Sequence, residues 1–174
     1  EVKTFDEYCE SIGNFMNLNI SRMEELRGPM LISISPKFIS TLTASYYGGS
    51  IVQADQKRVE FTNTEDRVIE IVGRGLIEAL SESWSDLMNI SITHQGREAN
   101  PQFASFVDGN EHVIICSFLI QLPNAEAINM DIVYPLQTLK PIASQLRSRI
   151  QSELGDSDVS WREMMERAIL NVPL

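Results

Sequence analysis

Apolar residues recur along this chain with two periods, one typical of helices and one typical of strands. Spacings of three and four predict helices over about residues 3–16 and 63–88, and a third helix that begins at Pro36. Pro135 opens a further predicted helix, and residues 160–169 form a last short one. Shorter apolar runs predict five strands, which are Ile20–Leu26, Met30–Ile34, Ile90–His94, Val113–Gln121 and Ala127–Tyr134. An Arg27-Gly28-Pro29 turn is expected between the first two strands.

The longest predicted helix carries a start signal and an internal interruption. Thr62-Asn63-Thr64-Glu65 is a capping box, in which a hydroxyl caps the helix and a carboxylate three residues later accepts a hydrogen bond from the backbone of the cap residue. Gly73 and Gly75 interrupt the apolar stripe. Each glycine costs about 1 kcal/mol relative to alanine, which close packing against a neighbour would offset.

The order of predicted elements repeats once along the chain. Both halves run helix, strand, strand, proline, helix, and the second half carries one additional long strand, Val113–Gln121. Asn19-Ile20-Ser21 matches Asn89-Ile90-Ser91, and Met30–Pro36 is echoed by Ile128–Pro135. We therefore predict an α/β fold of the α+β type, in which a pseudo-two-fold repeated αββα unit forms one central, mostly antiparallel sheet flanked by helices.

Length, charge and cysteine content narrow the class of protein. A chain of 174 residues suits one domain, and its 14 basic against 24 acidic residues argue against binding to nucleic acid. No apolar stretch is long enough to span a membrane, and no signal peptide opens the chain. Cys9 and Cys116 are expected to be buried thiols of a reducing compartment, so a cytoplasmic protein is expected.

The sequence offers no pattern typical of a catalytic, metal or cofactor site. His94 and His112 have no cysteine or second histidine at ligand spacing. There is no G-x-S-x-G elbow, no Walker A string and no G-x-G-x-x-G loop. We therefore expect no catalytic residues, no metal and no cofactor.

One segment between two periodic stretches is unusually apolar for a turn: Tyr46-Tyr47-Gly48-Gly49-Ser50-Ile51. Paired glycines let another backbone approach closely, and the tyrosines and Ile51 would leave apolar surface for a partner. The alternative is an ordinary helix end, with Gly48 as the residue after the cap and the tyrosines packed inward. The buried face of the Pro36 helix is expected to comprise Phe38, Ile39, Leu42 and Tyr46.

Several motifs occur together in the order typical of one family. The first are Leu26-Arg27-Gly28, the Gly48-Gly49 loop and Phe61–Ile69. They are followed by Asn100–Ala104, Asn110–Val113, Tyr134-Pro135 and Lys140–Ile142. With these motifs the chain resembles, over roughly residues 5–150, the middle domain of the family of the flagellar motor switch protein FliM.

The resemblance implies a fold shared with the CheC and CheX phosphatases and a non-catalytic role in the cytoplasmic C ring of the flagellar basal body, in motility and chemotaxis. It implies that FliG binds the segment Tyr46, Tyr47, Gly48, Gly49, Ser50 and Ile51, and that neighbouring FliM subunits pack side by side through the first helix and the Pro36 helix. The family loop is Gly-Gly-x-Gly, and here Ile51 replaces the last glycine.

The resemblance also implies how the chain divides. Residues 1–152 correspond to the middle domain, and residues 153–174 to a linker and short helix that lead to an absent C-terminal SpoA domain like FliN. FliN and phosphorylated CheY would bind only through segments absent from this chain.

Two other functions stand beside the scaffold role. A CheC-like phosphatase needs an Asp or Ser followed by Glu-x-x-Asn on a helix, but Gly13, Gly73 and Ser81 occupy the amide position after Glu10, Glu70 and Glu78. The sequence therefore disfavours a phosphatase of phosphorylated response regulators. A domain that only spaces the segments beyond its ends would bind partners equally well after mutation of the glycine loop.

Overall fold

The structure is a computed structural model that describes residues 1–47, 58–121 and 126–148. The chain divides into two compact units, Glu1–Leu139 and Lys140–Leu174. The second unit begins with the short helix η2 (Lys140–Ile142) and continues as a helix over residues 143–148. The expected boundary at residue 152, the break at 155–158 and the helix at 160–169 lie outside the described residues, so that division stays a prediction.

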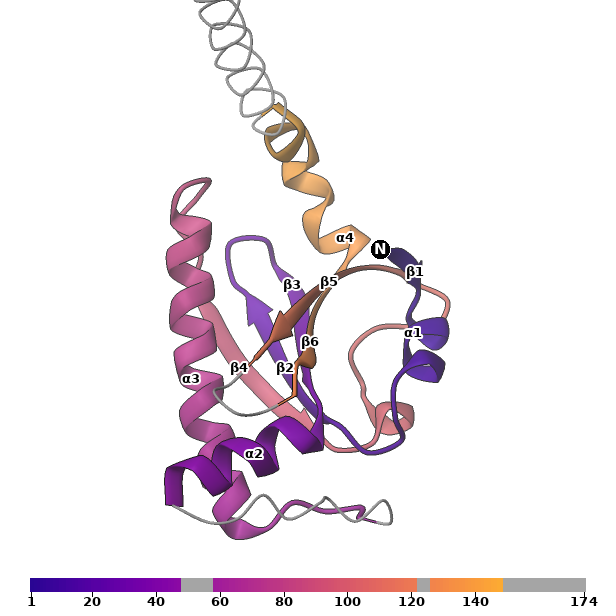
Figure 1. Ribbon diagram of the computed structural model, residues 1–174. Helices are drawn as coiled ribbons and strands as arrows, with labels where there is room; N and C mark the ends of the chain where they lie inside the picture. The colour runs from indigo at the N-terminus through magenta and orange to yellow at the C-terminus, as the bar shows by residue number, and fades with distance from the viewer. Residues whose placement is uncertain (48–57, 122–125, 149–174) are drawn as a thin grey trace, which may run out of the picture. The chain divides into compact units, whose positions relative to one another are not determined.

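Among the described residues, the first unit is built on a six-stranded antiparallel sheet with the order β1-β5-β6-β3-β2-β4 (Figure 1). Helix α1 (Phe5–Ser11) lies on one side of this sheet, and α2 (Pro36–Tyr47) and α3 (Asn63–Ser85) lie on the other (Figure 1). The short helix α4 (Leu136–Leu139) follows the last strand. The strands are β1 (Val2–Thr4), β2 (Asn17–Met23), β3 (Gly28–Ile34), β4 (Ile92–Glu98), β5 (His112–Ile120) and β6 (Ile128–Pro135).

The predicted pseudo-two-fold fold is confirmed, and its axis passes between β3 and β6. When Pro36 is matched to Pro135, Ile32 falls on Asp131 and Ser33 falls on Ile132. The register pair Ile32–Ile132 is then replaced by the pair Ser33–Asp131, and the reverse, as a two-fold axis between the strands requires. The hairpins β2–β3 and β5–β6 then correspond, with β1 and β4 at the two edges. The proposed match of Asn19–Ser21 with Asn89–Ser91 is wrong, because the counterpart of β2 is β5.

The helix predicted over residues 3–16 is wrong at both ends. Thr4 is the N-cap of α1, since its hydroxyl accepts a hydrogen bond from the Glu7 N–H at 3.3 Å and its own N–H donates to the Glu7 carboxylate at 2.8 Å. The residues before this cap form β1, in which Val2 pairs with Ile114 of β5. The helix ends at Ser11, ahead of Gly13.

The hairpin β2–β3 turns earlier than predicted, at residues 24–27. Arg27 takes the left-handed conformation that closes the turn, with φ 52°. Gly28 and Pro29 therefore belong to β3. Pro29 is tolerated there because β6 pairs with β3 only from Leu31 onward.

Strand β4 also differs from its prediction of Ile90–His94. It begins at Ile92 and continues to Glu98 through polar residues that give no strand signal. Its register against β2 shifts between Ile20 and Ser21, so that the facing residues jump from Gly96 to His94. The strands predicted at Val113–Gln121 and Ala127–Tyr134 are confirmed to within a residue as β5 and β6.

Candidate partner-binding site at the end of helix α2

Helix α2 begins at Pro36, as predicted, and its exposure increases toward its C-terminal end. Ser35 precedes the helix, and its hydroxyl accepts a hydrogen bond from the Phe38 N–H at 3.3 Å. Phe38 and Ile39 are buried in the first two turns, whereas the last three residues of the helix are exposed. The apolar stripe thus continues beyond the surface on which the helix packs.

Tyr46 and Tyr47 end this helix as a pair of exposed aromatic rings. Their side chains are 69% and 56% exposed, and their ring centroids lie 5.0 Å apart at 70°. The prediction that Tyr46 lies on the buried face is therefore wrong. Gly48, Gly49, Ser50 and Ile51, the rest of the predicted site, lie outside the described residues.

The chain is described again at Arg58, which is fixed beside α2 by a buried carboxylate. Glu65, only 5% exposed, sits in the first turn of α3 and accepts hydrogen bonds from Arg58 Nη1 at 3.1 Å and from Ser40 Oγ of α2 at 2.8 Å. A second guanidinium nitrogen, Arg58 Nη2, also pairs with it. Glu65 thereby joins α2, α3 and the segment that leads into α3.

Glu65 is also the carboxylate of the predicted capping box. It accepts hydrogen bonds from the Thr62 N–H at 2.9 Å and from the Thr62 hydroxyl at 3.0 Å. Burial alone would raise the pKa of Glu65, but the hydrogen bonds from Arg58, Thr62 and Ser40 lower the pKa to about 2. The side chain is therefore ionised at neutral pH and holds both helices next to the predicted site.

The sequence also led to expectations for the two cysteines and the two histidines, which the structure locates. Cys9 and Cys116 are free thiols that are half-buried rather than buried, and burial raises the pKa of Cys9 to about 11. His94 and His112 are exposed on β4 and β5. Within the described ranges, no three His, Cys, Asp or Glu side chains are grouped closely enough to hold a metal ion.

Two features near α2 and α3 have weak sequence signals or none. The ion pair of Arg58 with Glu65 joins residues seven apart across a bend, for which no periodic pattern exists. Asn17, Asn19 and Ser21 are buried on one face of β2, and their alternation with Leu18 and Ile20 is a signal that sequence reasoning missed. Among the helices that the structure describes, none has the length and apolar character needed to cross a membrane.

Comparison with known proteins identifies the family. The family model described as flagellar motor switch protein FliM matches residues 1–151. The flagellar motor switch protein FliM of Pseudomonas aeruginosa is 29% identical over 172 residues, which are 99% of this chain and 53% of that protein. This chain therefore spans about half the length of that relative.

Solved structures agree with this match. The FliM middle domain of Vibrio alginolyticus superposes with a TM-score of 0.74 at 26% identity, covering 83% of this chain and 79% of that one. A chain from a FliG–FliM complex of Helicobacter pylori superposes with a TM-score of 0.71 at 23% identity, covering 80% of this chain and 78% of that one, which shows the shared fold. Because the family model matches most of its length, the chain belongs to the FliM family of flagellar motor switch proteins.

Proposed function

We propose that this chain is a non-catalytic structural domain of the flagellar motor switch complex, at the cytoplasmic C ring of the basal body. The family match over residues 1–151 is the observation that carries the proposal. In the ring the domain transmits torque and takes part in rotational switching by binding FliG and, side by side, neighbouring copies of itself.

The FliG site in this proposal is the segment Tyr46–Ile51. Two exposed aromatic rings at the end of a helix are a common anchor for a protein partner. The ionised Glu65 network fixes both the helix that presents them and the chain at Arg58. A similar fold from Helicobacter pylori has been solved in a FliG–FliM complex, which supports FliG as the partner.

Calorimetric titration of the 174-residue chain with FliG from the same organism tests the site. We expect Tyr46→Ala and Gly49→Asp each to weaken binding by tenfold or more, about 1.4 kcal/mol, because interface aromatics and close backbone approach carry much of the binding free energy. The matched control is Phe103→Ala, since Phe103 is 71% exposed, as Tyr46 is 69% exposed, but lies on another element.

Three other outcomes would contradict parts of the proposal. Equal loss of affinity in Phe103→Ala would show that the effect of Tyr46→Ala is not specific to the end of α2. Unchanged affinity in every variant would place the FliG surface elsewhere on the domain and leave the glycine loop as a spacer. Release of inorganic phosphate from a phosphorylated receiver domain mixed with this chain would contradict the non-catalytic assignment.

A further inference from the structure

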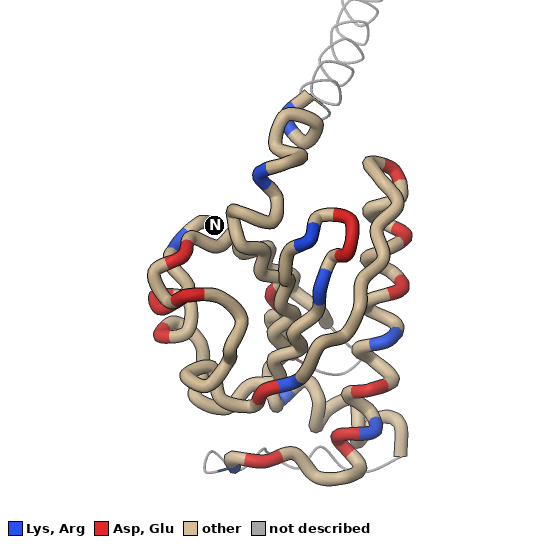
Figure 2. The backbone as a smooth tube through the Cα atoms, turned by 180° about the vertical axis from the view of Figure 1, so that it is seen from behind, with Lys and Arg blue, Asp and Glu red and all other residues tan. Residues whose placement is uncertain are grey.

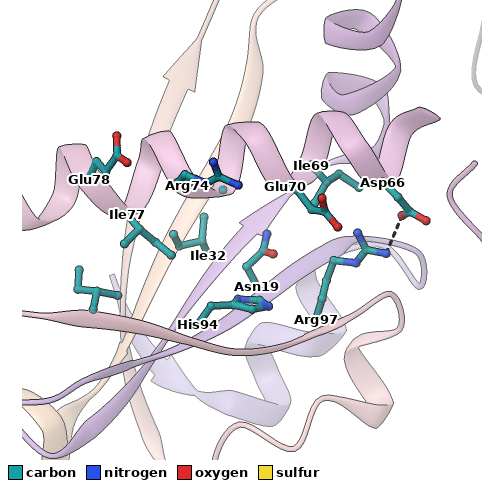
Figure 3. A pocket seen from close by; sticks show the side chains of 12 residues that line it. Asn19, Ile32, Asp66, Ile69, Glu70, Arg74, Ile77, Glu78, His94 and Arg97 are labelled. Atoms are coloured by element: carbon teal, nitrogen blue, oxygen red, sulfur yellow. Dashed lines mark hydrogen bonds and ion pairs between the residues drawn. The ribbon is translucent and has the colours of Figure 1, made fainter. Parts of the chain in front are cut away.

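A cavity of about 760 Å³ lies under α3 in the first unit, against β2, β3 and β4 (Figure 3). This volume falls in the range of roughly 300–1,000 Å³ that is usual for small-molecule sites. Its apolar lining consists of the isoleucine side chains Ile32, Ile69, Ile77 and Ile92.

The cavity lies between two points that fix α3. At one end, Arg97 Nη2 of β4 pairs with Asp66 Oδ1 of α3 at 2.6 Å. Near the other end of the helix, Trp84 Nε1 donates to the Tyr134 hydroxyl at 3.4 Å. The cavity is therefore spanned by a helix that is held on both sides, which favours a preformed site.

Asn19 is the one polar side chain in this lining that is nine-tenths buried in the described structure. It is 7% exposed, and Figure 3 shows its carboxamide pointing into the cavity toward α3. No described residue forms a hydrogen bond with that carboxamide. Asn19 contributes none of the fully buried side-chain atoms that lack a partner, so its amide nitrogen and oxygen are accessible from the cavity. A ligand that pairs with the carboxamide therefore replaces water there. The carboxamide offers adjacent donors and an acceptor.

Gly73 keeps the cavity open on the side of the helix. A Cβ atom built on Gly73 meets nothing within 4 Å, and the same is true of Gly75. Close packing within the described residues therefore does not account for either glycine, although each weakens the helix. Gly73 lines the cavity and Gly75 does not, so only a side chain at residue 73 would enter it.

The charged rim of the cavity limits the charge of a ligand. Asp66 and Arg97 neutralise one another, which leaves Glu70, Arg74 and Glu78 on the helix side. Figure 2 shows that acidic segments predominate along α3. Two carboxylates against one guanidinium disfavour an anion.

We propose that this cavity binds a small, flat, uncharged molecule that carries an adjacent hydrogen-bond donor and acceptor, such as a nucleobase or a primary carboxamide. The isoleucine side chains pack against the flat faces of this molecule. The Asn19 carboxamide pairs with its polar edge, in the way that asparagine pairs with the edge of adenine. None of the lining residues belongs to Tyr46–Ile51, and the proposal does not depend on the proposed FliG binding.

Saturation-transfer NMR on the 174-residue chain tests the proposal, with adenosine and nicotinamide as probes at millimolar concentration. We expect saturation transfer to at least one probe. We expect the signal to weaken strongly in Gly73→Leu, whose side chain would project into the cavity, and to persist in Gly75→Leu. The second variant is a matched control, because both substitutions replace a glycine of the same helix by a better helix former.

Two analogues test the ligand chemistry. For each probe that binds, we expect the signal to be lost when its amino group is dimethylated, because the donor next to the acceptor is removed. We expect adenosine monophosphate to bind more weakly than adenosine. No saturation transfer to either probe, an unchanged signal in Gly73→Leu, retained binding of the dimethylated analogue or tighter binding of the monophosphate would overturn the proposal.

Discussion

Helix α1 covers one face of the sheet with 7 residues, whereas α3 extends along part of the other face with 23. The short helix completes a hydrophobic cluster, in which the rings of Phe5 and Phe106 meet edge to face with centroids 5.3 Å apart, and a smaller pocket of about 450 Å³ lies beside it. The long helix buries only Val68 and Ile69 among its apolar residues and leaves a cavity of about 760 Å³. Helix length alone therefore does not decide how much open space remains on each face of the sheet.

Two adjacent residues of β3 allow the two faces of the sheet to be compared. Leu31 belongs to the cluster under α1 and is 0% exposed, while Ile32 lines the cavity under α3 and is 1% exposed. Both side chains are thus removed from solvent to the same degree, in the same central strand. They differ in that Ile32 borders the cavity under α3, whereas Leu31 borders neither that cavity nor the pocket beside α1.

The largest expected effect compares these two neighbours. We expect Leu31→Ala to lower the free energy of unfolding by about 4 kcal/mol, because the lost transfer free energy is accompanied by a new cavity at a position that borders neither pocket. Ile32→Ala should cost about 2 kcal/mol, mostly transfer free energy, because its space joins an existing cavity. Urea unfolding of both variants measures the difference. Equal losses would mean that the cavity under α3 is filled in solution.

A smaller effect is expected at the buried carboxylate that joins α2 to α3. The pKa of Glu65 falls from 4.5 to about 2 on folding, which corresponds to about 3 kcal/mol of stability. Because the folded-state pKa is lowered, this stability is complete above pH 4.5 and is lost as the pH falls to about 2. We expect Glu65→Gln to lower the free energy of unfolding by about 3 kcal/mol at pH 7 and to flatten its pH dependence between these values.

The neighbouring residue provides the control for this prediction. Asp66 pairs with Arg97, but their side chains are 35% and 32% exposed, so the pair is screened by solvent. Asp66→Asn should therefore cost less than about 1 kcal/mol at pH 7. Losses of the same size in both variants would show that Glu65 does not carry the stabilisation that its hydrogen bonds indicate.

The elements whose boundaries are set by residues close together in the sequence could be predicted. Pro36 begins α2, Thr62 caps α3 through Glu65, and β3 and β6 each run up to a proline-marked helix start. The register between β3 and β6 also agrees with the repeat that these prolines mark. The order of elements and the fold class could therefore be predicted.

Features that depend on distant partners could not be predicted in the same way. Lys3 and Thr4 of β1 fall within the predicted helix, because their pairing with β5 leaves no trace in a periodic pattern. The polar end of β4 lies at an edge of the sheet, where apolar alternation is not required. At the candidate site, Tyr46 continues the spacing of the α2 stripe but extends past the core that the stripe covers.

The smallest expected effects are stabilising and concern the two glycines of α3. Because a Cβ atom at Gly73 or Gly75 meets nothing within 4 Å, we expect Gly73→Ala and Gly75→Ala each to raise the free energy of unfolding by about 1 kcal/mol. Gly28 is the contrasting position, since a Cβ there would lie 2.7 Å from Cβ of Thr138. Gly28→Ala should therefore destabilise the chain, by about 2 kcal/mol. Thermal unfolding of the three variants separates these cases, and a destabilising Gly73→Ala would show that the face of α3 over the cavity is closely packed after all.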